Sequence, residues 1–105
     1  MSRPAVYSLL RQLYSYLVAS QKYDENSLVI WVEDPSASVR HFNLFALPRG
    51  SVNNLYVCEE VGPGNNVLAT YRTLGETMDI ISGYRVIKVD LVVDGTVLSM
   101  LSFGS

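Results

Sequence analysis

The chain has 105 residues, a formal net charge of −2, and 49% hydrophobic against 17% charged residues. This length leaves room for one core of ordinary size, so we expect residues 1–105 to form a single domain. The acidic balance argues against a nucleic-acid-binding protein, which usually carries a basic surface. The single cysteine, Cys58, has no partner for an internal disulfide and indicates a reducing compartment.

The sequence shows no targeting segment. The N-terminus lacks a long apolar core followed by a small-residue cleavage site. The longest uninterrupted apolar run, from Leu28 to Val32, is far shorter than the ~20 residues of a membrane-spanning helix. We therefore expect a cytoplasmic protein, located in the host cytoplasm if it is viral.

The first 20 residues predict an amphipathic helix. Ser2 can cap it, and Pro4 fits its first turn, where a missing N–H costs little. Apolar residues recur at helical spacing and predict the buried side, namely Val6, Leu9, Leu10, Leu13 and Leu17. The outer side is unusually poor in charge, because only Arg11 interrupts it, and a solvated helix face is normally more charged.

Four strands are expected next, over residues 28–32, 39–47, 52–60 and 67–73. The first is apolar throughout, which favours a strand covered on both faces. In the second, three alternate positions face one side, namely Phe42, Leu44 and Ala46. In the third, we expect Leu55 and Val57 to point inward and Cys58 to point to the opposite face.

Residues 76–82 are ambiguous, because their apolar positions fit either a short helical turn or a strand. The stretch from Tyr84 to Phe103 is clearer, since Asp94-Gly95 separates two β-branched, alternating runs and predicts a two-residue hairpin turn. On the first strand of this hairpin, one face should carry the odd-numbered residues Arg85, Ile87, Val89, Leu91 and Val93. Lys88 and Asp90 should mark the other face.

One helix followed by strands with mostly short connections predicts an α+β fold. We expect the N-terminal helix to pack on a meandering antiparallel sheet of about five to seven strands, since parallel neighbours would need long crossovers. Two alternatives remain open. The strands could close into a small β-barrel with the helix as a lid, or the sheet could pair with its copy across a two-fold axis.

Candidate catalytic residues are few. His41 is the only histidine and lacks a second metal ligand at a useful spacing, so a half-buried strand residue is the simpler interpretation. Neighbouring strands could bring it to Cys58 as a nucleophile pair, but Glu59 and Glu60 would raise the pKa of that thiol. These two carboxylates should also point to opposite faces and so should not share one metal ion. We expect no catalytic residue, cofactor or metal.

The composition favours a non-enzymatic protein–protein interaction module. So many apolar residues on so small a chain indicate that part of its surface is buried against another chain. We therefore expect a homodimer that also binds another protein, as an accessory or inhibitory protein, and a viral, phage or mobile-element origin would fit the size. The alternatives are a small enzyme or ligand-binding domain with a pocket between helix and sheet, and a nucleic-acid-binding protein.

The candidate interface residues come from two places. The outer part of the first helix offers aromatic side chains that bring contact area at low entropic cost, and the last strand could expose open hydrogen-bonding groups to a partner. These candidates are Tyr7, Arg11, Tyr14, Tyr16, Met100 and Phe103.

Overall fold

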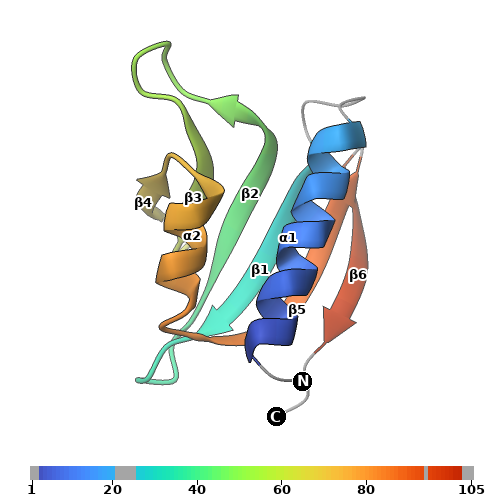
Figure 1. Cartoon of the computed structure of the whole chain (residues 1–105). Coiled ribbons are helices and arrows are strands. Elements are labelled where there is room, and N and C mark those ends of the chain that lie inside the picture. Colours follow the sequence, from blue (N-terminus) through green and yellow to red (C-terminus); the bar gives the residue numbers. More distant parts are fainter. Residues whose placement is uncertain (1–2, 21–25, 94, 103–105) are drawn as a thin grey trace.

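The chain forms two helices and six strands, and both helices lie on one face of an antiparallel sheet (Figure 1). The elements are α1 (Arg3–Ser20), β1 (Ser27–Glu33), β2 (Val39–Arg49), β3 (Tyr56–Val61), β4 (Val67–Tyr71), α2 (Leu74–Ile81), β5 (Arg85–Val93) and β6 (Thr96–Ser102). This computed structural model describes residues 3–20, 26–93 and 95–102, with the backbone alone at residues 3, 4, 20 and 99–101. Ser2, the expected helix cap, lies outside these residues.

The strands lie in the order β4-β3-β2-β1-β5-β6, and every neighbouring pair is antiparallel. β1 to β4 follow one another as a meander, and α2 then carries the chain back so that β5 pairs with the free side of β1. The predicted α+β fold, with a helix packed on an antiparallel sheet, is confirmed. The alternative β-barrel is wrong, because β4 and β6 are the two edges of an open sheet.

The hydrophobic core lies between the helices and the sheet. Alternation along β1 and β2 turns one side chain in two toward the helices, and these side chains are fully buried. α1 packs across β1 and β2, whereas α2 packs on β3 and β4. The core contains Val6, Leu10, Leu17, Leu28, Ile30, Val32, Phe42, Leu44, Ala46, Cys58, Met78, Ile81, Val89 and Leu91.

The ambiguous segment is a helix. Thr73 has an extended backbone, and its hydroxyl accepts a hydrogen bond from the backbone N–H of Glu76 at 3.1 Å. A Thr followed three residues later by Glu is the spacing of a capping box, which is a start signal that the apolar pattern alone does not show. Met78 and Ile81 point into the core from this helix, so tertiary burial supports the cap.

The expected hairpin forms. Val93 pairs with Thr96, and Gly95 between them has a φ of +76°, a backbone conformation that glycine adopts without strain. One expected face is wrong, because the pairing of β1 with β5 skips a residue between Val86 and Lys88. This β-bulge turns Arg85 to the face of Glu33, with which it forms an ion pair of 3.3 Å.

The third strand, expected over residues 52–60, is shorter than predicted and has six residues. Residues 51–54 form a turn closed by a hydrogen bond from Asn54 N–H to the Ser51 carbonyl at 2.9 Å, and β3 begins only at Tyr56. Leu55 is therefore exposed, and Cys58 is buried in the core, the reverse of the expectation. Cys58 faces the core because it pairs with Leu44, which is fully buried on the helix side of the sheet.

We predict that the core depends on α1. Leu10→Ala removes a fully buried side chain, so it should lower the free energy of unfolding by about 2–5 kcal/mol. Tyr16→Ala, on the same helix at a position 68% exposed, is the matched control and should change it by less than about 0.5 kcal/mol. Urea unfolding followed by circular dichroism measures both. Equal losses in the two variants would contradict the assigned packing of the helix.

Candidate interaction surface

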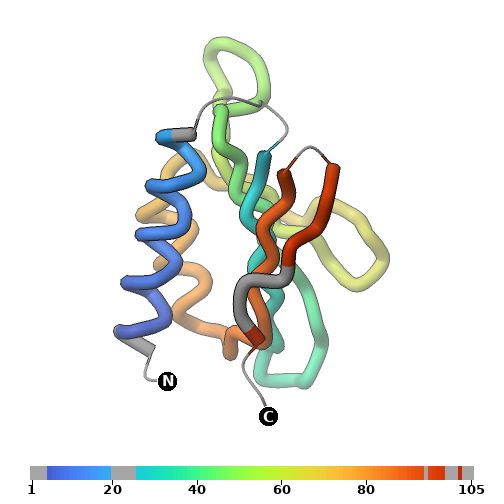
Figure 2. Tube along the Cα trace, turned by 90° about the vertical axis from the view of Figure 1, so that its right-hand side faces the viewer, coloured from blue at the N-terminus to red at the C-terminus, as the bar shows by residue number. Residues whose placement is uncertain are grey.

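The second face of the sheet carries no helix. Both helices lie together on one side of the strands (Figure 2), so the side chains at the alternate strand positions point away from the core. We call this surface the open face. The pairing register places on it Val29, Trp31, Glu33, Val39, His41, Asn43, Phe45, Glu59, Val61, Val67, Thr70, Arg85, Lys88, Asp90, Val92 and Val97.

Trp31 is the centre of the open face. It lies on the central strand β1 and is paired with His41 on one side and Lys88 on the other. The Trp31 and His41 rings have centroids 4.5 Å apart at an interplanar angle of 40°, and Lys88 Nζ lies 5.0 Å from the Trp31 ring. These contacts hold the Trp31 side chain in place between its neighbours on β2 and β5.

Asp90 is buried beside this cluster. Trp31 Nε1 donates a hydrogen bond to Asp90 Oδ2 at 3.2 Å, and Lys88 Nζ lies 3.7 Å from the same oxygen. Asp90 is 5% exposed, and its other carboxylate oxygen has no hydrogen-bond partner among the residues that the structure describes. A buried carboxylate with one oxygen left unpaired is destabilising by itself, so this part of the open face is not optimised for the isolated chain.

A second aromatic cluster lies toward β3. Phe45 is almost fully buried under two neighbours: Arg49, whose guanidinium carbon is 3.7 Å from the ring centroid, and Tyr56, whose ring meets it edge-on at 6.4 Å. The Tyr56 hydroxyl donates to Glu59 Oε2 at 3.2 Å. Aromatic side chains thus extend over β1, β2 and β3, which are neighbouring strands.

Valines border these aromatic clusters. Val39 is 40% exposed, and Val67 and Val97 are more exposed still. Beside Val39, a hollow of about 310 Å³ opens between the Trp31–His41 pair and the loop residue Pro63. Apolar and aromatic groups therefore reach solvent across the full width of the sheet, from β4 to β6, which is uncommon for a solvated sheet face.

An ionic network lies on the helix side, at the end of the sheet. Arg40 Nη1 contacts Glu60 Oε2 at 2.7 Å and Arg40 Nη2 contacts Asp34 Oδ2 at 2.8 Å, while the Tyr71 hydroxyl donates to Glu60 Oε1 at 2.6 Å. The guanidinium also lies over the Tyr84 ring. Glu60 is buried, and its partners come from β2 and β4. The network therefore ties strand ends together and satisfies a buried charge.

The adjacent carboxylates Glu59 and Glu60 point to opposite faces, as expected from strand alternation. Glu60 joins the helix-side network, whereas Glu59 contacts Tyr56 on the open face. Among the residues that the structure describes, no group of three or more His, Cys, Asp or Glu residues could hold a metal ion.

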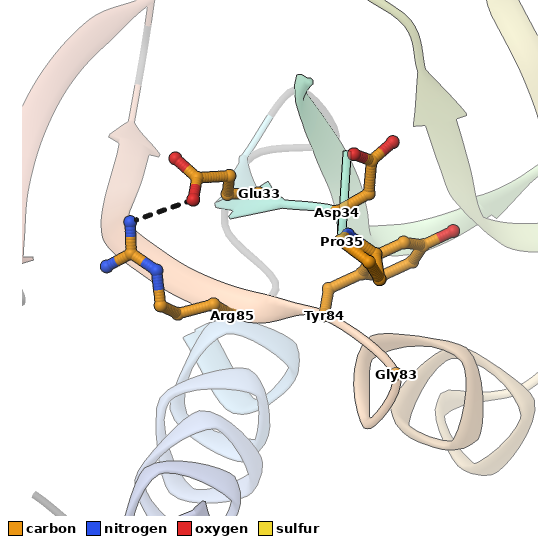
Figure 3. Close-up of a pocket in the computed structure, with 6 residues that line it drawn as sticks. All are labelled: Glu33, Asp34, Pro35, Gly83, Tyr84 and Arg85. Atoms are coloured by element: carbon orange, nitrogen blue, oxygen red, sulfur yellow. Dashed lines mark ion pairs between the residues drawn. The ribbon is translucent and has the colours of Figure 1, made fainter. Parts of the chain in front are cut away.

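A second hollow, of about 280 Å³, lies where the β1–β2 turn meets the start of β5 (Figure 3). On one side Glu33 is held by its ion pair with Arg85, and on the other Asp34 and Pro35 lie near Tyr84. Hydrogen bonds from the Ser36 side chain and the Ser38 backbone hold the pKa of Asp34 below its ordinary value. Glu33 thus links β1 to β5, whereas Asp34 holds the β1–β2 turn.

His41 and Cys58 do not form a pair. His41 is paired with Val61 on the open face, whereas Cys58 is paired with Leu44 on the helix face. Burial, as the largest cause, raises the pKa of Cys58 to about 12, and burial lowers the pKa of His41. The thiol is therefore protonated at neutral pH, and His41 does not lie beside it.

The interface candidates lie in different environments. Arg11 and Tyr16 are exposed on α1. Tyr7 and Tyr14 pack partly against the core, and the Tyr14 hydroxyl donates to the Phe45 carbonyl at 3.2 Å. Met100 lies in β6 and its side chain is not described, and Phe103 lies outside the described residues. The six candidates remain a prediction.

Sequence reasoning missed the open face itself. It interpreted the apolar run of β1 as a strand covered on both sides, although the structure covers only one side. A usable signal was present in β2, where His41 and Asn43 alternate with Phe42 and Leu44. That alternation is typical of a strand with one buried and one uncovered face.

Comparison with protein families, curated proteins and solved structures finds no match to this chain. None of the described helices is long and apolar enough to cross a membrane.

We predict that Cys58 is unreactive in the folded protein. Because its pKa is raised to about 12, a thiol-specific reagent at pH 8 should modify it only when the protein unfolds. Labelling with and without denaturant, followed by mass spectrometry, measures this. Rapid modification of the native protein would contradict the assigned position of Cys58.

We also predict a stability change near neutral pH that comes from His41. Its folded-state pKa is lowered below the ordinary value of 6.5, so below that pH the unfolded chain binds more protons than the folded one. The free energy of unfolding should therefore decrease as the pH falls through 6.5 toward the folded-state pKa. His41→Gln should remove this component, as measured by urea unfolding at a series of pH values. An unchanged pH dependence in the variant would exclude His41 as its source.

Proposed function

We propose that this protein is a non-enzymatic protein–protein interaction module that forms a homodimer. The observation that supports the proposal is the open face, where Trp31, His41 and several valines reach solvent on a sheet covered by helices on one side only. An exposed apolar and aromatic face of this kind is typical of a protein–protein interaction site.

The chemistry of the described residues is consistent with this proposal. The one thiol is buried and protonated, and the one histidine lies on the other face of the sheet. Such a module would act by occupying a partner's surface, as an accessory or inhibitory protein, and a viral, phage or mobile-element origin would fit its size. A single cysteine suits the reducing cytoplasm in which we propose that it works.

One observation favours a second candidate function. The hollow beside His41 and Trp31 could hold a small molecule, which would make the protein a ligand-binding domain or a small enzyme. His41→Ala separates the two ideas. Loss of a measured catalytic activity with the fold intact would favour the enzyme, whereas unchanged binding of a protein partner would favour the interaction module.

We predict a dimer in solution. Light scattering over a range of concentrations should give a mass twice that of the monomer, and the urea midpoint should rise with protein concentration, because association stabilises the folded state. A monomeric mass at the highest concentration, with a midpoint independent of concentration, would remove the homodimer from the proposal.

A further inference from the structure

We propose that the open face is covered by the open face of a second copy of this chain, with a two-fold axis that runs parallel to β1 and β2. The inference rests on the proposed homodimer and adds its surface and its symmetry. In this arrangement two sheets stack into a sandwich about 10 Å apart, with the strands of the two copies nearly aligned.

The area of the open face fits such a dimer. Six strands spaced by about 4.8 Å, with about six residues each at about 3.3 Å, cover roughly 600 Å² per copy. Two copies then bury about 1,200 Å², which is the lower end of the range for specific interfaces. The outer side of α1, about 27 Å long and 10 Å wide, offers less than half of the area of the open face of one copy.

The sheet edges are less suited to self-association. The edge strand β4 has five residues, and its pairing with β3 is irregular between Ala69 and Val67. At the other edge, the pairing of β6 with β5 is irregular between Leu101 and Ser99. Short edge strands and bulges are devices that oppose edge-to-edge pairing, so the face is the better candidate.

The centre of the open face suits a two-fold axis. In a two-fold interface the residues nearest the axis contact their own copies. β1 and β2 are the two middle strands of the sheet, so an axis between them brings the Trp31–His41 pair against the same pair of the second copy. Large aromatic groups at the centre of an interface, with valines around them, match the usual distribution of binding energy.

Charge decides the direction of the axis. Glu59 lies on β3 and Lys88 on β5, on opposite sides of the middle strands, and the Lys88 side chain is 44% exposed. An axis parallel to the strands sets β3 over β5 of the second copy. Each Glu59 carboxylate then faces one Lys88 ammonium group, which gives two such contacts in the dimer. An axis perpendicular to the strands would set β3 over β3 and bring like charges together, which is unfavourable.

The geometry of this charge pair is within reach. Lys88 shares its row with Val61, two residues along β3 from Glu59, which is an offset of about 7 Å along the strands. The flexible Lys88 side chain can cover much of that offset. Of the other open-face charges, Glu33 and Arg85 already form an ion pair. Asp90 lies 3.7 Å from Lys88 Nζ within the same copy, so in the dimer Lys88 would have a carboxylate of each copy near it.

A charge-reversal experiment tests the surface and the axis together. Glu59→Lys and Lys88→Glu are prepared separately and then mixed in equal amounts. Each variant alone should be mainly monomeric by light scattering, with a dissociation constant raised by roughly tenfold or more, because each homodimer contains two like-charge contacts. The mixture should return to dimers, because both contacts are then between opposite charges.

Matched controls identify the surface. Asp79→Lys, on α2, reverses an exposed charge away from the open face and should leave the dimer unchanged. Val39→Lys, on the open face, should give monomers, whereas Val52→Lys, at a loop position 89% exposed, should not. Lys88→Glu places a second carboxylate beside Asp90 and could prevent folding, which circular dichroism would show. In that case the valine pair still tests the surface.

The outcomes separate this inference from the proposed function. A wild-type dimer that persists in Glu59→Lys and in Val39→Lys, or that is lost in Asp79→Lys, overturns the open-face arrangement and leaves the homodimer standing. Two monomeric variants that do not associate on mixing overturn the parallel axis. A monomeric wild type overturns the homodimer, and the arrangement with it.

Discussion

Two helices bury one face of a six-stranded sheet, and this one-sided burial is the constraint on which the rest of the structure depends. Because side chains alternate along each strand, burying Leu28, Ile30 and Val32 beneath α1 forces Val29 and Trp31 to the opposite side. A slip of one residue would exchange the two sets. The same packing that stabilises the core therefore creates the open face and decides which side chains form it.

The ionic network at the end of the sheet helps to fix the register of the strands. Glu60 is a charge buried on the helix side, and it is tolerable only because Arg40 and Tyr71 supply hydrogen bonds from the two neighbouring strands. Arg40 in turn reaches Asp34 in the β1–β2 turn. Shifting any of these strands would leave a buried charge unpaired, so the network opposes other registers and keeps the open face in one arrangement.

The open face combines features that are unusual for a solvated surface. A tryptophan lies at its centre, and valines border it. A buried carboxylate beside the tryptophan has one oxygen that no described residue contacts by a hydrogen bond. A second protein layer would reduce the exposed apolar area in the way that a second sheet does in a β-sandwich. The proposed dimer thus supplies on the open side what the two helices supply on the other.

Local signals in the sequence determined the elements of this protein. The apolar spacing predicts α1, and Asp94-Gly95 predicts the hairpin. The apolar pattern alone left α2 ambiguous, but Thr73 and Glu76 have the spacing of a helix N-cap. These signals act between residues close along the chain, so they can be interpreted without knowing the fold. They were sufficient to predict an α+β fold with a helix on an antiparallel sheet.

Only the tertiary structure decided which face each residue occupies and what lies beside it. Pairing with Leu44 places Cys58 in the core, and the bulge near Lys88 turns Arg85 toward Glu33. The Trp31–His41 contact and the uncovered side of β1 likewise depend on strands that are distant in sequence. Such features come from pairing between strands that are distant in the sequence, and no local pattern specifies that pairing. The candidate surface could therefore be identified only once the tertiary structure was known.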